Sequence, residues 1–79
     1  MSTTETEIIQ AIAEQLGLTP DDVDKNSLLY DDLNLGPIEL NDLLSKLSQK
    51  FNISFEPDQI EHLSKVEDLV LLVEDNLLD

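Results

Sequence analysis

The sequence predicts an all-α fold with three main helices, one short helix and a long first loop. With 79 residues, 41% of them hydrophobic, the chain can fill one small core, so residues 1–79 are expected to form a single domain. The apolar residues are overwhelmingly Leu, Ile and Val, and aromatic residues make up only 4%, which is typical of helices packed in aliphatic layers. In three segments these residues also recur at the spacing of a helix with one buried face.

The first of these segments predicts a helix over residues 5–16. Thr4 and Glu7 form a capping-box pattern, in which each side chain bonds the free backbone N–H of the other residue. Gly17 follows, and glycine commonly takes the left-handed conformation after a last helical turn. The buried face is expected to comprise Ile8, Ile9, Ile12, Ala13 and Leu16.

Helical spacing then disappears, and residues 18–36 are expected to form a long loop. Thr19, Pro20 and Asp22 predict one brief helical turn within it, since proline suits the first helical position and an acid suits the positive end of a helix. A loop this long is uncommon in a small domain and often carries function. Isolated apolar residues are expected to anchor it, namely Val23, Leu28, Leu29, Leu33 and Leu35.

The strongest helical pattern covers residues 37–51. Asn52 is expected to end this helix, and residues 53–55 are expected to continue in an extended form. One broad stripe of the helix is predicted to be buried, consisting of Ile38, Leu40, Leu43, Leu44, Leu47 and Phe51.

Two further helical signals complete the chain. Pro57 is expected near the start of a single short turn that directs Ile60 and Leu63 inward. The last helix is predicted to open with a capping box between Ser64 and Glu67. Its apolar face comprises Val66, Leu69, Val70, Val73 and Leu77, and its outer face comprises Glu67, Asp68, Glu74 and Asp75.

Charge and composition narrow the classes of partner and compartment. A net charge of −14 makes nucleic acid and anionic lipid poor partners. It favours a protein partner with a basic or mixed-charge surface. The same acidity would also arise in a protein whose charge only keeps it soluble. The absence of cysteine excludes disulfides and thiolate metal sites. Residues 1–7 are polar and acidic, and no later apolar run could span a bilayer. We therefore expect a cytoplasmic monomer without stable membrane insertion.

The order of these features resembles the acyl carrier protein family, whose members are small acidic four-helix bundles that carry acyl, peptidyl or related groups on a phosphopantetheine arm. The likeness covers nearly the whole chain, through "IIQAIAEQLGLTPDDV", "DDLNLGPIELNDLLSKLSQKFNISF" and "HLSKVEDLVLLV". The resemblance implies an acyl-carrier-protein-like four-helix bundle with a role in acyl or fatty-acid metabolism.

In that family the arm is attached to the serine of an Asp-Ser-Leu triplet at the start of the second helix. In this register the triplet is Gly36, Pro37 and Ile38. Proline offers neither an oxygen nucleophile nor a backbone N–H, so attachment cannot occur at Pro37 and no phosphopantetheine is expected there. The fold tolerates the change, because proline suits the first helical position and glycine at the cap costs only a few tenths of a kcal/mol.

The resemblance also implies that an acidic face of the second helix recognises partner enzymes. Here that helix carries Lys46 and Lys50 as well as Glu39 and Asp42. Asp42 and Lys46 are four residues apart and can form a simple surface ion pair, or the mixture of charges reflects a changed partner. The candidate partner-binding residues are Pro37, Ile38, Glu39, Asp42 and Lys46.

Another serine is the alternative attachment site. Ser27 stands in "NSL", which resembles the family triplet, but no helical pattern begins there and a structural loop serine is favoured. Ser45 and Ser48 lie within the second helix, where their hydroxyls are expected to be solvated or bonded to a preceding carbonyl.

Metal binding and catalysis are not expected. Asp22, Asp24 and Asn26 alternate as at the start of an EF-hand loop, but the glycine and the bidentate glutamate of that loop are missing. His62 is the only histidine and has no Cys or second His for a catalytic pair or a zinc site. A chain this small also lacks an evident cleft that would raise the pKa of one carboxyl against another.

The sequence thus predicts a non-enzymatic acyl-carrier-protein-like protein that lacks the phosphopantetheine serine and works as a protein-interaction or regulatory module. Two alternatives stay open. One is a working covalent carrier modified on another serine, with Ser27 as the first candidate. The other is a noncovalent acyl or lipid binder that holds its ligand in the aliphatic core between the second and last helices.

Overall fold

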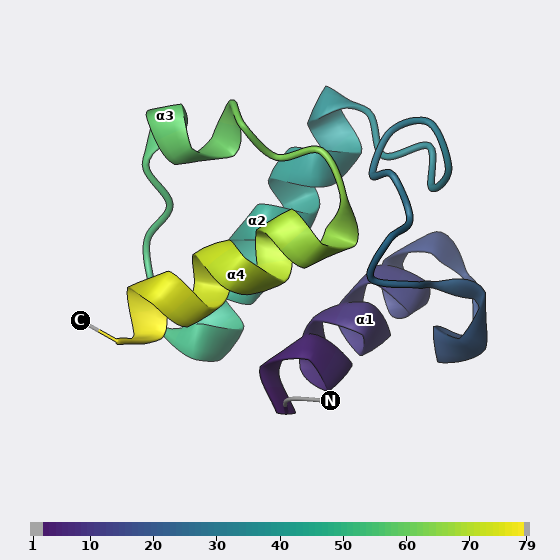
Figure 1. Ribbon diagram of the computed structural model, residues 1–79, viewed down its shortest axis with the longest axis horizontal. Helices are drawn as coiled ribbons and strands as arrows, with labels where there is room; N and C mark the ends of the chain where they lie inside the picture. Colours follow the sequence, from purple (N-terminus) through teal and green to yellow (C-terminus); the bar gives the residue numbers. More distant parts are fainter. Residues whose placement is uncertain (1–2, 79) are drawn as a thin grey trace.

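Four α-helices and one 3-10 helix follow one another along residues 3–78, the part of the chain that this computed structural model describes. The elements are α1 (Thr3–Leu16), η1 (Pro20–Asp22), α2 (Pro37–Phe51), α3 (Pro57–Ile60) and α4 (Val66–Leu77). Figure 1 shows α1 and α3 on opposite sides of the bundle, with the long loop beside the start of α2. The predicted architecture of three main helices, a short helix and a long first loop is confirmed.

Helix α1 begins earlier than predicted and ends where predicted. Thr4 is its second residue, so the expected capping box between Thr4 and Glu7 is wrong. Gly17 has φ of 71° and donates its N–H to the Glu14 carbonyl at 3.4 Å, while the Leu18 N–H reaches the Ala13 carbonyl at 2.8 Å. These two bonds form a Schellman motif, which satisfies carbonyls that the helix end leaves free.

A single aliphatic core joins all the main helices. Helix α1 packs against α2, α4 and η1, so its apolar face lies at the centre of the molecule. Of the loop residues expected to anchor the long loop, Val23, Leu29, Leu33 and Leu35 are buried and Leu28 is half-buried. The buried side chains are Ile8, Ile9, Ile12, Ala13, Val23, Leu29, Leu33, Leu35, Leu43, Leu44, Leu47, Val66, Leu69, Val70 and Val73.

The apolar stripe of α2 is narrower than predicted. Ile38 is 75% exposed, and Leu40 and Phe51 are only half-buried. With 3.6 residues per turn, Ile38 is rotated by about 140° from Leu43, a core residue five positions later, and faces solvent. Leu77, predicted on the apolar face of α4, is also exposed, because it lies in the last turn of that helix.

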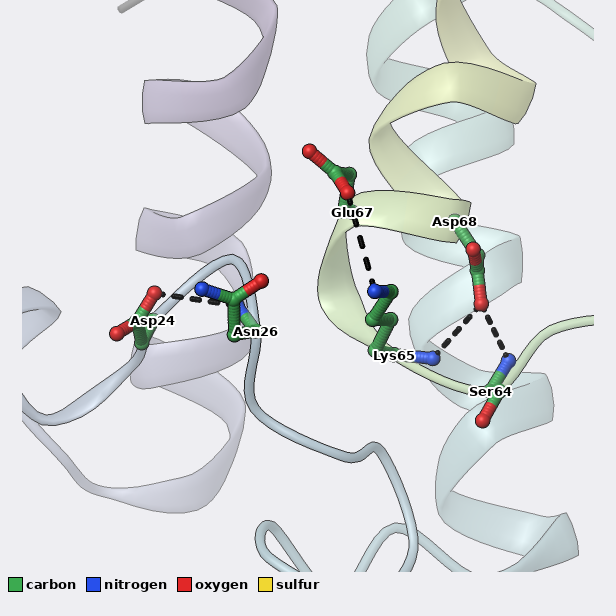
Figure 2. Close-up of polar contacts among 6 residues, drawn as sticks. All are labelled: Asp24, Asn26, Ser64, Lys65, Glu67 and Asp68. Atoms are coloured by element: carbon green, nitrogen blue, oxygen red, sulfur yellow. Dashed lines mark hydrogen bonds and ion pairs between the residues drawn. The ribbon is translucent and has the colours of Figure 1, made fainter.

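Helix α4 begins one residue later than predicted. Its N-cap is Lys65, and the Asp68 carboxylate accepts the N–H groups of both Ser64 and Lys65 at 3.0 Å (Figure 2). The expected capping box between Ser64 and Glu67 is therefore wrong. Glu67 instead faces the Lys65 Nζ at 4.0 Å.

Carbonyl groups of the long loop explain this later start. The N–H groups of Val66 and Glu67 donate to the carbonyls of Ser27 and Lys25 at 3.0 and 2.9 Å. These amides of the first turn of α4 thus find partners some forty residues back in the chain, as the numbering shows. The loop is consequently tied to α4 as well as to the core.

Candidate functional site

The end of the long loop, residues 28–35, forms a compact turn directly before the start of α2. The N–H groups of Leu33 and Leu35 donate to the carbonyls of Leu28 and Leu29 at 3.0 and 2.8 Å. The Asp32 carboxylate accepts the Leu28 N–H at 2.8 Å. Because Leu29, Leu33 and Leu35 are buried, the turn has a defined position relative to α2.

Gly36 and Pro37 form the first turn of α2. Gly36 is the N-cap, and its carbonyl accepts the Leu40 N–H at 2.8 Å. Pro37 occupies the first helical position, where the missing N–H would have had no intrahelical partner. The Glu39 carboxylate bends back over the cap, since a Cβ added to Gly36 would lie 2.9 Å from its Oε1 atom.

This turn does not fit a phosphopantetheine arm as a covalent ligand. Attachment requires an oxygen nucleophile, and Gly36, Pro37 and Ile38 have none in their side chains. Glu39, the next residue, brings a negative charge to the helix start, where a serine-bearing turn would receive a phosphate. The local geometry is therefore that of a helix start without the attachment chemistry.

All five candidate partner-binding residues lie exposed on α2. Ile38 is an exposed large apolar side chain, and it follows Pro37 at the tip of the helix. The expected ion pair between Asp42 and Lys46 is wrong. Within residues 3–78 the ion pair that forms is that of Lys65 with Glu67.

Gln15 of α1 takes the place of Asp42 as the neighbour of Lys46. Its Nε2 donates to the Glu39 carbonyl at 2.7 Å, and its Oε1 accepts from the Lys46 Nζ at 3.4 Å. One side chain therefore links α1 to two turns of α2. The sequence offers no signal for this role, because the contact joins residues 24 and 31 positions apart.

The alternative attachment serine has a structural role in the loop. The Ser27 hydroxyl oxygen accepts the Asp24 N–H at 3.1 Å, and the Ser27 carbonyl caps α4. The Ser48 hydroxyl donates to the Ile53 carbonyl after the end of α2, and Ser45 is exposed. Ser27 therefore lies in a hydrogen-bonded turn, whereas Pro37 lies at a helix start.

The core between α2 and α4 is filled by side chains. Leu43 and Leu47 from α2, and Leu69 and Val73 from α4, have no exposed surface. A bound acyl chain would have to displace them. A shallow groove of about 220 Å³ lies outside this core, beside the tip of α2, and is lined by Leu28, Leu29, Tyr30, Asp31, Leu35, Leu40, Leu63 and Ser64.

Some carboxylates of the long loop accept hydrogen bonds from neighbouring residues of the same loop. Asp22 accepts both the N–H and the hydroxyl of Thr19 at 3.1 and 3.0 Å, and Asp24 accepts the Asn26 N–H (Figure 2). Between residues 3 and 78 no three His, Cys, Asp or Glu side chains are grouped as a metal site would require. His62 is exposed.

None of the helices within the described residues has the length and hydropathy that a membrane crossing requires.

Comparisons with known proteins identify relatives of this chain and a solved structure with the same fold. A family model described as a phosphopantetheine attachment site matches residues 6–73. An acyl carrier protein of Chlamydia trachomatis serovar L2 is 31% identical over 72 residues, covering 91% of this chain and 94% of the relative. One from Exiguobacterium sibiricum is 35% identical over 68 residues, covering 86% of each chain. The crystal structure of a Thermotoga maritima acyl carrier protein has the same fold, with a TM-score of 0.76, 24% identity and coverage of 90% and 82%.

Proposed function

The chain belongs to the acyl carrier protein family, and from that membership we propose that it is a member that carries no phosphopantetheine at the family position and acts through protein contacts. The observation that carries the proposal is the residue at the start of α2. The family resemblance assigns attachment to this position, and here it is Pro37. Proline preserves the helix start while it removes the nucleophile.

The proposed contact surface is the exposed tip and side of α2. Ile38 supplies an apolar anchor that has no partner in the core. The side chains of Glu39 and Asp42 supply negative charge, and Lys46 adds a positive charge directed toward Gln15. A partner of mixed charge, with an apolar pocket for Ile38 and a basic group near the carboxylates, would match this arrangement.

Acyl or fatty-acid metabolism is the proposed context. The relatives at 31% and 35% identity are named acyl carrier proteins and match this chain over most of their length, and the Thermotoga maritima acyl carrier protein has the same fold. A carrier-shaped protein without an arm can occupy the docking sites of carrier enzymes without delivering a group. We therefore propose a regulatory or scaffolding role in such a pathway.

Intact mass spectrometry tests the absence of the arm. The wild-type protein, incubated with coenzyme A and a phosphopantetheinyl transferase of broad specificity, is expected to keep its mass. The matched control is the double variant Gly36→Asp with Pro37→Ser, which is expected to gain one phosphopantetheine. A Cβ at position 36 would meet only the Glu39 Oε1 atom, at the far end of a flexible side chain, so the control should fold. A gain of one arm by the wild type would refute the proposal.

The same mass measurement distinguishes the proposed function from the alternative of a covalent carrier modified on another serine. If the wild type gained an arm that Ser27→Ala abolished, Ser27 would be the attachment residue. The noncovalent alternative predicts bound lipid or fatty acid in native mass spectra of gently purified protein. The proposed function predicts bare protein in those spectra.

Charge reversal tests the contact surface. Proteins retained by the immobilised wild type are compared with those retained by the variant Glu39→Lys with Asp42→Lys. Loss of specific partners is expected, because both carboxylates would become repulsive to a basic group. The variant Glu74→Lys with Asp75→Lys on α4 is the control for the change in net charge. If the α2 variant retained the same partners as the wild type, the contact would lie elsewhere on the molecule.

A further inference from the structure

A groove lies between the first half of α1 and the loop segment that contains η1, and is called the α1–η1 groove below. Its volume is about 660 Å³, against about 220 Å³ for the groove beside the tip of α2. Among the described residues that line it, none belongs to α2. The lining residues are Glu5, Thr6, Ile9, Gln10, Pro20, Asp21, Val23, Asp24 and Lys25.

The floor of the α1–η1 groove is apolar and belongs to the core. Ile9 of α1 and Val23 of the loop are 8% and 5% exposed, and both are members of the aliphatic core. Pro20, at the start of η1, is exposed beside them. Because α1 packs against η1, this floor is present before any ligand binds, and it suits an apolar side chain of a partner.

The rim of the groove is acidic, and two of its carboxylates have no cation beside them. Asp21 is exposed, and its carboxylate forms no hydrogen bond or ion pair with residues 3–78. Asp24 is exposed as well, and its Oδ1 accepts only the Asn26 N–H at 3.1 Å (Figure 2). These two carboxylates therefore remain available to a positively charged group.

The charges of the whole lining favour a cation as well. Glu5 lies in the first turn of α1, where a carboxylate also stabilises the helix start. The exposed Lys25 is the only base of the lining, so three carboxylates stand against one ammonium group. The groove thus combines an apolar floor with a net negative rim.

We propose that the α1–η1 groove binds a basic segment of a partner protein, with an apolar side chain over Ile9 and Val23 and a Lys or Arg side chain facing Asp21 and Asp24. This contact goes beyond the proposed function, because it lies on α1 and the loop, whereas the proposed contact surface lies on α2. The molecule would then have two separate docking surfaces.

Charge and polarity select this occupant over the others. A second copy of the chain would bring 18 acids and only 4 lysines to an acidic rim. An acyl chain would cover the carboxylates without offering them a hydrogen-bond donor. A polyamine would match the rim and leave the apolar floor uncovered. A basic segment that contains an apolar residue matches both parts of the groove.

Peptide titrations of the full-length, 15N-labelled protein test the proposal. The probe is a short synthetic peptide that alternates Leu with Arg and Lys, and in the control peptide Ser replaces each Leu. Saturable amide shifts are expected at positions 9, 21, 23 and 24. The Ser peptide and spermidine are expected to bind at least about tenfold more weakly, because neither covers the apolar floor.

A matched pair of variants separates local from general charge attraction. Asp21→Asn with Asp24→Asn should weaken probe binding by about tenfold, because the two charges that face the cation are lost. Asp58→Asn with Glu61→Gln at α3 changes the net charge equally and should weaken binding by less than about twofold. Figure 1 shows η1, in dark blue, and α3 on opposite sides of the molecule. All four side chains are exposed, so both variants should fold.

Photo-crosslinking in cells of the source organism tests the natural occupant. A benzoylphenylalanine at position 10, on the rim, is expected to crosslink a peptide of another protein that contains Lys or Arg beside an apolar residue. The adduct should be lost in the variant Asp21→Asn with Asp24→Asn and retained in the α3 variant.

Several results would overturn the proposal. These are the absence of shifts at the groove, equal affinity for the Leu and Ser peptides, equal weakening by the two variants, and an adduct that is absent or consists of two copies of this chain. The failure of the proposed function is a different observation. An arm gained by the wild type would refute that function and leave peptide binding at the α1–η1 groove unaffected.

Discussion

At the scale of single residues, Pro37 fits the start of α2 although its side chain has no nucleophilic atom. The first position of a helix tolerates proline without loss of a hydrogen bond, so the fold places no demand for a serine there. Other single residues are under strict backbone constraint. Gly17 ends α1 with φ of 71°, and Asn52 ends α2 with φ of 56°, both in the left-handed region.

Gly17→Ala should destabilise the protein by about 1–2 kcal/mol, because a Cβ disfavours the left-handed conformation. Space is not the cause, since nothing lies within 4 Å of the added atom. Gly17→Asn is the matched control and should cost clearly less, because asparagine tolerates this conformation. Urea unfolding measures both, and equal losses would contradict the conformational explanation.

At the scale of elements, each main helix is positioned by contacts that come from elsewhere in the chain. Helix α4 receives carbonyls from the long loop at its first turn, and its own Asp68 caps the preceding amides. Helix α2 is held to α1 by Gln15 and by its buried leucines. The helices therefore begin and pack where these partners lie.

Asp68→Ala should lower the free energy of unfolding by about 1–2 kcal/mol, because it removes an acceptor for two backbone N–H groups. Glu67→Ala is its neighbour and control. Glu67 makes an exposed ion pair with Lys65 at 4.0 Å, so its loss should cost no more than about 0.5 kcal/mol. If chemical denaturation ranked the two variants the other way, the capping assignment would be wrong.

Two substitutions to alanine in α2 test which face of the helix is buried. Leu43→Ala should cost about 2–5 kcal/mol, since Leu43 has no exposed surface. Ile38→Ala should stay within about 0.5 kcal/mol, since that side chain is 75% exposed. Thermal and urea unfolding compare them, and a large loss at Ile38 would mean that it is buried as its sequence spacing had indicated.

At the scale of the whole molecule, the aliphatic core offsets a large self-repulsion. The chain has extents of 31 × 26 × 20 Å, and a net charge of −14 lies over this small volume. Like charges at such spacing disfavour the compact state, and salt screens them. Residues 43–55 include no Asp or Glu and interrupt this negative surface.

Raising NaCl from about 0.01 to 0.5 M should raise Tm by several degrees, because screening relieves the repulsion between carboxylates. Differential scanning calorimetry measures the shift. A variant with Asp21→Asn, Asp31→Asn and Glu61→Gln has three fewer exposed charges and should start from a higher Tm and respond less. A Tm that did not change with salt in either protein would show that the repulsion is negligible.

The sequence by itself determined the helices of this protein. Helical spacing predicted α2 at its observed bounds, and turn-forming residues predicted η1 and the ends at Gly17 and Asn52, because these signals act over a few neighbouring residues. The position of Pro37 at a helix start was predicted for the same reason.

Only the tertiary structure decided which of these residues face one another. The later start of α4 and the hydrogen bond from Lys46 to Gln15 both depend on contacts between distant segments. Ile38 is exposed because the core that covers Leu43 lies on another side of α2. Periodicity describes one face of one helix, and it does not say where the neighbouring helix ends or which loop carbonyl reaches its first turn. A groove between α2 and α3 arises in the same way, because its lining residues Leu44, Phe55 and Ile60 come from segments that meet only in the folded chain.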